Sequence, residues 1–414
     1  MPDEGSSRRH IPRLSAELRE GETVKPLELF FDLAFVLVFT QCTALMADDP
    51  TWAGIGRGVL VLAVLWWAWV GYAWLTSVLD PEEGSIRIVM FAAMAALLVA
   101  ALCVPEAFGD RALEFAVAYA VLRFAHIALF VIASREDAEL RHSVWGLAIS
   151  TSIGVGLIFG AAYLDSPAQE LLWLLAVALD AGGPLLIDAR GWRLQPRHFA
   201  ERHNLIIILA LGESIVALGV GAQVELTTGV IVTAVLGIGL AAALWWIYFD
   251  VVSLVTERRL LLADDVLARN RLARDSYSYL HFPMVAGIVL AALGLEATIA
   301  HVDHALPVEE AFALLGGVAI YLLGHVALRW RNAHTLNRQR FGLAIVLFAL
   351  VPLATEVSAL TTLAAVNVLL WLMIAYETSR YDDRRYRLRH GLDPDVEGGP
   401  IGAERRDPAN PESG

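Results

Sequence analysis

The sequence KPLELFFDLAFVLVFTQ, from Lys25 to Gln41, combines an apolar run of membrane length with two carboxylates. Glu28 and Asp32 lie one helical turn apart, so on a helix they share one face. An ionised side chain at the centre of a bilayer costs about 2.5–3.5 kcal/mol on insertion scales, and such acids therefore usually face protein or water. The stretch predicts a membrane-spanning helix whose acidic face is directed into the protein.

The composition of the whole chain is also that of a membrane protein. Of 414 residues, 57% are hydrophobic and 18% are charged, whereas soluble domains average about a quarter charged residues. Apolar runs of about 18 or more residues recur along the sequence, which is typical of transmembrane helices. The net charge of −13 is spread over loops, tails and a few membrane positions, so we expect no nucleic-acid partner.

Twelve apolar segments predict an all-α polytopic membrane protein with about 12 transmembrane helices. Lys and Arg collect in the two tails and in alternate loops; of the 31, only Arg57, Arg111 and Arg123 lie elsewhere. This positive-inside pattern predicts an even number of spans with both termini in the cytoplasm. The predicted spans are 27–46, 54–79, 87–108, 112–133, 143–163, 168–188, 203–221, 228–253, 277–300, 308–328, 341–358 and 360–378.

Three segments outside the spans have their own patterns. Residues 1–26 are charged and are predicted to form a cytoplasmic N-terminal tail. Residues 256–275 mix a leucine stripe with arginines, which predicts either a helix at the membrane interface or an ordinary solvated connector. Residues 381–414 contain many Pro, Gly, Asp and Glu residues and are predicted to be a disordered cytoplasmic tail.

Short strings recur in the same order along the chain, which predicts an internal duplication. They are LWW at 65–67 and 244–246, GLAI at 146–149 and 342–345, and LLWL at 171–174 and 369–372. We predict two parallel six-helix repeats, 27–190 and 203–380, joined by a basic cytoplasmic linker at 191–202. A pseudo-symmetry axis would then run along the membrane normal.

This duplication places one acid in the first helix of each half. It pairs Asp32 with Glu213, while an alternative register pairs Glu28 with Glu201. If Asp32 and Glu213 approach each other across the axis, the pair could carry a proton or bind a cation. The alternative is that each acid makes a structural hydrogen bond to another helix.

Three stretches resemble the low temperature requirement A (LtrA) family of bacterial membrane proteins. They are LELFFDLAFVLVFTQ at 27–41, HFAERHNLIIILALGESIVALG at 198–219 and YSYLHFPMVAGIVLAALGLE at 277–296. The resemblance implies a multi-pass protein of the bacterial plasma membrane, and it implies no defined biochemical activity. More loosely, the Phe-Phe-Asp opening is similar to a family of proton-gated potassium channels that begins each half with Phe-Ser-Asp.

Ionisable side chains within the predicted spans are the candidate ion- or substrate-binding residues. They are Glu28, Asp32, Glu213, Arg123, His126, Glu296 and His281. Arg123 lies deep in its span and needs an anionic partner, for which we predict Asp32 or Glu114.

A second cluster lies just before and at the start of the seventh predicted span. It consists of Arg197, His198, Glu201, Arg202 and His203. One interpretation is anchoring at the membrane edge with local ion pairs, each worth less than about 1 kcal/mol when exposed. The other is a cytoplasmic gate or a site for a lipid head group.

These features favour a secondary transporter or an ion- or proton-conducting protein in the lipid bilayer, acting on an unknown small solute, proton or cation. The alternatives are a membrane-embedded sensor or scaffold and a membrane enzyme acting on lipid. The sequence contains no H-E-x-x-H, G-x-S-x-G, Walker or C-x-x-C motif. We therefore expect no enzymatic activity, metal site or cofactor. A homodimer is compatible with the sequence.

Overall fold

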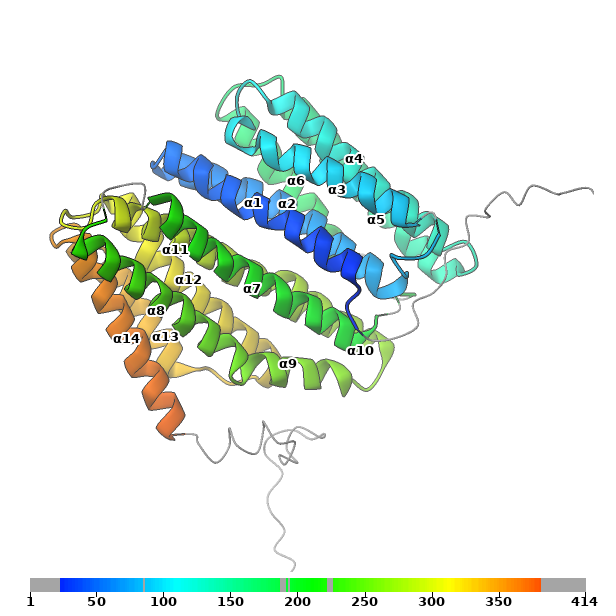
Figure 1. Ribbon diagram of the computed structural model, residues 1–414. Coiled ribbons are helices and arrows are strands. Elements are labelled where there is room, and N and C mark those ends of the chain that lie inside the picture. The colour runs from blue at the N-terminus through cyan, green and yellow to red at the C-terminus, as the bar shows by residue number, and fades with distance from the viewer. Residues whose placement is uncertain (1–22, 85, 187–190, 193, 222–225, 381–414) are drawn as a thin grey trace, which may run out of the picture.

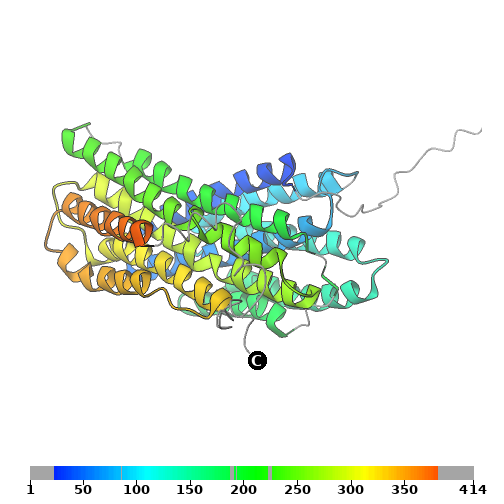
Figure 2. The ribbon, with the colours of Figure 1, turned by 90° about the horizontal axis from the view of Figure 1, so that it is seen from below.

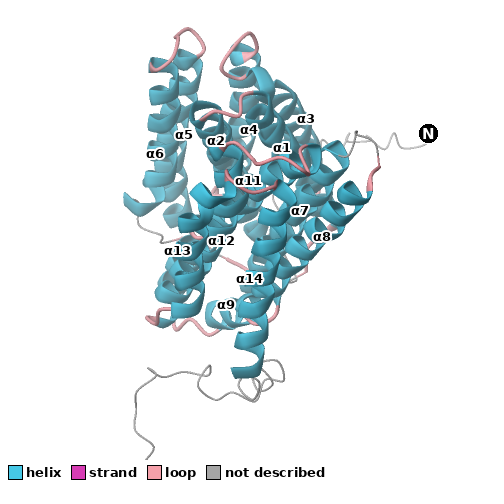
Figure 3. Ribbon diagram, turned by 90° about the vertical axis from the view of Figure 1, so that its left-hand side faces the viewer, coloured by secondary structure: helices cyan, strands magenta, loops and turns pink. Residues whose placement is uncertain are grey.

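The structure is a computed structural model that describes residues 23–84, 86–186, 191–192, 194–221 and 226–380. Helices are the regular elements of this part of the chain, as Figure 3 shows, and the all-α prediction is confirmed. Twelve helices here have 17 residues or more. They are α1 (Pro26–Asp48), α2 (Trp52–Val78), α3 (Ile86–Cys103), α4 (Ala112–Ala133), α5 (Ala138–Ala161), α6 (Ala168–Leu186), α7 (Pro196–Gly221), α8 (Thr228–Phe249), α11 (His281–Ala300), α12 (Val308–Ala333), α13 (Arg338–Ala354) and α14 (Ala359–Arg380).

In the described part of the chain, ten helical segments are long and apolar enough to cross a bilayer. The two long helices outside this set are α6 and α13. With 17 residues, α13 is shorter than the roughly 20 that a spanning helix needs. The protein is thus a multi-pass membrane protein. The twelve long helices of the described chain match the number of predicted spans, although ten of them are long and apolar enough to cross a bilayer.

The segment predicted as one interfacial helix at 256–275 is divided in the structure. It contains most of α9 (Val252–Leu261), all of α10 (Val266–Leu272) and the start of a wider helical turn, Ala273–Tyr279, that leads into α11. The prediction of a single helix there is wrong, since Asp265 caps a new helix by accepting a hydrogen bond from the Ala268 amide at 2.7 Å. Residues 1–22 of the predicted N-terminal tail (1–26) and the whole predicted tail at 381–414 lie outside the described residues, and α1 begins at Pro26.

The helices form two groups that lie side by side (Figures 1 and 2). In the first group, α1 contacts α2 and α3, α3 packs on α4, and α5 packs on α6. In the second group, α7 contacts α8 and α11, α11 packs on α12, and α12 packs on α13. The groups meet where α1 and α2 contact α7 and α11. We call the end of the bundle at which α1 begins and α14 ends the N/C end.

Close packing of α11 on α12 depends on glycines. A Cβ atom on Gly287 would lie 2.6 Å from the Gly317 carbonyl oxygen, and one on Gly294 would lie 2.5 Å from the Leu314 backbone nitrogen. Small residues at such positions let membrane helices approach closely. A side chain at either glycine would push the two helices apart.

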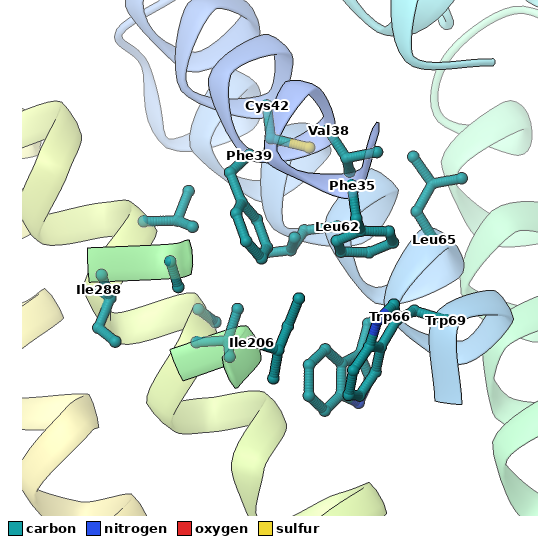
Figure 4. Close-up of a cluster of buried hydrophobic side chains, with 14 of the residues drawn as sticks. Phe35, Val38, Phe39, Cys42, Leu62, Leu65, Trp66, Trp69, Ile206 and Ile288 are labelled. Carbon is teal, nitrogen blue, oxygen red and sulfur yellow. The ribbon is translucent and has the colours of Figure 1, made fainter. Parts of the chain in front are cut away.

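An apolar cluster fills the centre of the interface between the two groups (Figure 4). Phe35 and Phe39 from α1, Trp66 from α2, Ile206 from α7 and Ile288 from α11 are each at most 1% exposed. These side chains fill the centre of the interface with apolar and aromatic groups, which offer no ligand to an ion.

Candidate functional site: buried charges between the two halves

Four charged or titratable side chains meet between α1 and α7 near the N/C end. We call Glu28, Asp32, His198 and Arg202 the charge cluster; each is at most 1% exposed. His198 Nε2 lies 2.7 Å from Glu28 Oε1, and Arg202 Nη1 lies 3.6 Å from the same oxygen. Arg202 Nη2 donates to Asp32 Oδ1. The cluster therefore joins the two halves of the molecule by buried ionic contacts.

Helical periodicity explains how the cluster forms. Glu28 and Asp32 are four residues apart on α1, and His198 and Arg202 are four residues apart on α7. Since α1 and α7 lie side by side (Figure 1), each pair presents one face to the other. The prediction that Glu28 and Asp32 share a face is confirmed, and two groups of candidates that the sequence kept apart form one cluster.

Residues of α2 complete the environment of Arg202. Thr76 Oγ1 accepts a hydrogen bond from Arg202 Nη1 at 2.8 Å, and the guanidinium carbon lies 5.5 Å from the centre of the Trp69 ring. Trp69 Nε1 also donates to Asp32 Oδ1 at 2.8 Å. Among the described residues, none is a hydrogen-bond partner of Asp32 Oδ2. The ionic contacts are thus embedded in aromatic packing rather than in water.

The remaining members of the predicted gate have different surroundings. Arg197 and Glu201 are exposed, and Glu201 Oε2 accepts a hydrogen bond from the Val24 amide at 3.2 Å. His203 is fully buried, and the centre of its ring lies 5.0 Å from that of Trp69 and 5.3 Å from that of His281. Of the five residues predicted as a gate at the membrane edge, two are therefore exposed and three are buried.

His281 takes part in a polar contact of the second half. Its Nε2 atom lies 2.8 Å from the Tyr248 hydroxyl, which lies 2.9 Å from Asn204 Oδ1. Its Nδ1 atom donates to the Ser276 carbonyl at 2.8 Å. These bonds satisfy both ring nitrogens, so His281 has the surroundings of a structural histidine.

Glu213 lies on the same helix interface, farther from the N/C end. Its Oε2 atom accepts a hydrogen bond from Thr40 Oγ1 at 2.7 Å, and the residue is 1% exposed. Thr40 follows Asp32 by eight residues, about 12 Å along a helix axis. The structure does not bring Asp32 and Glu213 together, because the apolar cluster lies between their levels.

Other acids lie near Glu213, and no basic side chain in the described chain forms an ion pair with it. Glu296 of α11 interacts electrostatically with Glu213, and Asp48 at the end of α1 interacts in turn with Glu296. Asp48 is exposed, Glu296 is half-buried and Glu213 is buried. The exposure of these three carboxylates therefore decreases from Asp48 through Glu296 to Glu213.

Arg123 belongs to a separate buried site within the first half. Its Nη2 atom lies 2.8 Å from Asp180 Oδ1 and 2.7 Å from Thr151 Oγ1, and its Nη1 atom donates to the Trp67 carbonyl at 3.2 Å. The predicted partner, Asp32 or Glu114, is wrong. Asp180 is 3% exposed, and it faces inward because α6, which carries it, packs on α2 and α5.

A cavity of about 90 Å³ lies beside Arg123. His126, three residues further along α4, also lines it. Neither Asp32 nor Glu213 is among the lining residues, so this cavity does not connect the two carboxylates. Among the described residues, no three His, Cys, Asp or Glu side chains are placed to hold a metal ion.

Comparison with known proteins agrees with this architecture. The family model for the bacterial low temperature requirement A protein (LtrA) matches residues 23–375. The chain belongs to the LtrA family. An uncharacterized protein of Rhizobium meliloti (strain 1021) is 29% identical over 408 residues, covering 92% of this chain and 96% of that protein. No solved structure matches the chain.

In this LtrA protein, the resembling motifs supply both sides of the charge cluster. The first motif carries Glu28 and Asp32, and the second carries His198, Arg202 and Glu213. Sequence patterns did not identify Thr40, Thr76 and Trp69, because uncharged partners of buried ions are ordinary residues of apolar helices. These partners became recognisable only once the helices were placed side by side.

Proposed function

We propose that this LtrA protein moves protons or small cations across the membrane, as a secondary transporter or an ion-conducting protein. The observation that supports this most directly is Glu213, a buried carboxylate whose described partner is a threonine hydroxyl rather than a base. An unpaired buried carboxylate is stable when it holds a proton or a bound cation. Intramembrane acids of this kind often mark ion pathways.

The acids near Glu213 provide an entry route for this proposal. Exposure decreases from Asp48 through Glu296 to Glu213, so a cation would be attracted at the surface and desolvated in steps. Thr40 would then hold the carboxylate of Glu213 toward α1. In this proposal, the route enters from the end of the bundle opposite the N/C end.

The charge cluster acts in this proposal as the gate near the N/C end. Its contacts cross from α1 to α7, and they must separate if the two halves move apart at this end. The clustering of Lys and Arg in the tails and alternate loops supports a cytoplasmic location for the N/C end.

We also propose that the two halves are parallel repeats, as the recurring strings predict. The pattern of helix contacts supports this: α1 with α2 and α3 corresponds to α7 with α8 and α11, and α3 with α4 corresponds to α11 with α12. Thr51 and Thr227 both cap the second helix of their half through the side-chain oxygen. In parallel-repeat transporters, the repeats rock against each other around a central site.

Flux in proteoliposomes tests the proposed function. Vesicles containing pyranine and the full chain receive a potassium diffusion potential with valinomycin, and proton entry is followed by fluorescence. Vesicles without valinomycin, loaded with a sodium- or a potassium-sensitive dye and given a gradient of that ion, test those two cations. We expect flux of one of these ions in the wild type and its loss in Glu213→Gln. The matched control is Glu114→Gln, at an exposed acid of α4, which should conduct normally.

Two outcomes would contradict the proposal. Wild-type vesicles without flux of any of the three ions would favour a sensor or scaffold. Normal flux in Glu213→Gln would remove this carboxylate from the route.

A further inference from the structure

An open groove of about 570 Å³ lies on the second half at the N/C end, where α12 ends and α13 begins. Its walls come from these two helices, from the segment that leads into α11, and from Leu185 in the last turn of α6. The volume is within the range of about 300–1,000 Å³ that is usual for small-molecule sites. The groove shares no lining residue with the cavity beside Arg123.

One face of α12 runs along the groove. Leu323, Val326, Ala327, Trp330 and Arg331 line it, and their spacing of three or four residues is that of a single helical face. From Leu323 to Arg331 the helix rises about 12 Å. The series is apolar as far as Ala327 and continues toward the N/C end with an indole and a guanidinium. Polarity thus increases along the groove toward the membrane surface, as it does along a lipid from its acyl chain to its head group.

Several large apolar side chains at the groove are exposed. Leu185, Trp330, Leu336 and Phe341 are between 40% and 57% exposed. Trp330 and Leu336 lie on either side of the reversal between α12 and α13, and tryptophan is enriched where membrane helices reach the interface. In a membrane protein, acyl chains rather than water are the favourable contact for this surface.

The polar end of the groove carries an excess of positive charge. Asp275 accepts hydrogen bonds from Arg274 at 2.8 Å and from Arg331 at 2.9 Å, so two arginines share one carboxylate. Arg338 is exposed at the start of α13, and residues 323–341 contain no acid. Three arginines and one aspartate therefore favour an anionic ligand over a neutral or cationic one.

Arg331 is accessible to such a ligand. Its side chain is 37% exposed, and its contacts with Asp275 use Nε and Nη2. A guanidinium has five N–H donors, so donors remain beyond these contacts. Arginine forms strong charge-assisted hydrogen bonds with phosphate, and basic sites between membrane helices on the cytoplasmic side bind anionic lipid head groups.

We propose that this groove binds an anionic phospholipid of the cytoplasmic leaflet, with an acyl chain along α12 and the phosphate beside Arg331 and Arg338. The choice of leaflet rests on the proposed orientation of the N/C end, whereas binding itself requires neither that orientation nor flux past Glu213. Because Leu185 belongs to the first half and the other lining residues belong to the second, the bound lipid contacts both halves.

Native mass spectrometry of the purified, delipidated full chain tests the preference for an anion. The probes are phosphatidylglycerol and phosphatidylcholine with the same palmitoyl and oleoyl chains. We expect phosphatidylglycerol to bind at least tenfold more tightly, and the double variant Arg331→Gln, Arg338→Gln to lose at least tenfold of this affinity. The matched control is Arg135→Gln, Arg141→Gln, at two exposed arginines around the start of α5, and it should bind as the wild type does.

A second pair of variants tests the path of the acyl chain. Ala327→Phe adds volume at a residue that lines the groove, whereas Ala95→Phe adds the same group at an exposed position of α3. We expect at least tenfold weaker phosphatidylglycerol binding in the first variant and wild-type binding in the second. Glycerol 3-phosphate, which has the charge without the chains, should not displace the lipid. If Ala327→Phe does not fold, the arginine variants decide.

Four results would overturn the proposal. They are equal affinity for the two lipids, wild-type affinity in the double arginine variant, wild-type affinity in a folded Ala327→Phe variant, and displacement of the lipid by glycerol 3-phosphate. A dimer of the wild type that dissociates in Ala327→Phe with unchanged lipid binding would assign the groove to a second copy of the chain instead.

Discussion

Replacing Arg202 by methionine is expected to destabilise the protein strongly. The side chain is 0% exposed and contacts Glu28, Asp32 and Thr76 across the interface between the two halves. Without it, two carboxylates that are 0% and 1% exposed lose their arginine partner. Removing one partner of a buried ion pair typically costs about 3–5 kcal/mol, because the other charge stays buried.

The free energy of unfolding measures this loss, by SDS titration in mixed micelles with dodecyl maltoside. We expect Arg202→Met to lower it by about 3–5 kcal/mol. Arg197→Met is the matched control, at an exposed arginine five residues earlier on α7, and should cost less than about 1 kcal/mol.

A double-mutant cycle separates the ionic contact from loss of packing. Asp32→Asn in the Arg202→Met background should cost less than it does alone, since it removes the unpaired charge, with a coupling energy of about 0.5–3 kcal/mol. Additive effects of the two substitutions would refute an energetic coupling between Asp32 and Arg202, and a small effect of Arg202→Met alone would refute its role in joining the halves.

Three further changes have defined outcomes. Arg340→Met should lower the same unfolding free energy by more than about 1.5 kcal/mol, because Arg340 makes a bidentate contact with Glu377 at 3.1 and 2.8 Å; equal stability with the wild type would contradict this. Gly294→Ala should lower the unfolding free energy by about 1–3 kcal/mol through its clash with α12. Gly212→Ala, with nothing within 4 Å of its Cβ, should be neutral or stabilising. SDS titration of both variants measures this, and a larger loss in Gly212→Ala than in Gly294→Ala would contradict the prediction. Thr40→Val removes the hydroxyl donor to Glu213 Oε2 and should lower, at least tenfold, the flux in vesicles of the ion that the wild type conducts, because the carboxylate loses a bond that holds it toward α1; unchanged flux would show that this bond does not position the acid.

The length of the apolar runs in the sequence was sufficient to predict the long helices. Runs of membrane length identified twelve helices near their observed positions, because a bilayer requires about 20 apolar residues per crossing. Helix ends were less predictable. The predicted linker at 191–202 includes the first residues of α7, which begins at Pro196, because a helix can begin in polar sequence when proline occupies its first turn.

The sequence by itself determined that Glu28 and Asp32 share a helical face and that charged side chains lie within apolar helices, since both follow from spacing along one chain. Only the tertiary structure decided their partners. It placed Asp32 against Arg202, Glu213 against Thr40, and Arg123 against Asp180 rather than Asp32. The physical reason is that a buried charge is stabilised by groups from other helices, and neither the rotation nor the relative level of two apolar helices is encoded in the local pattern of either one.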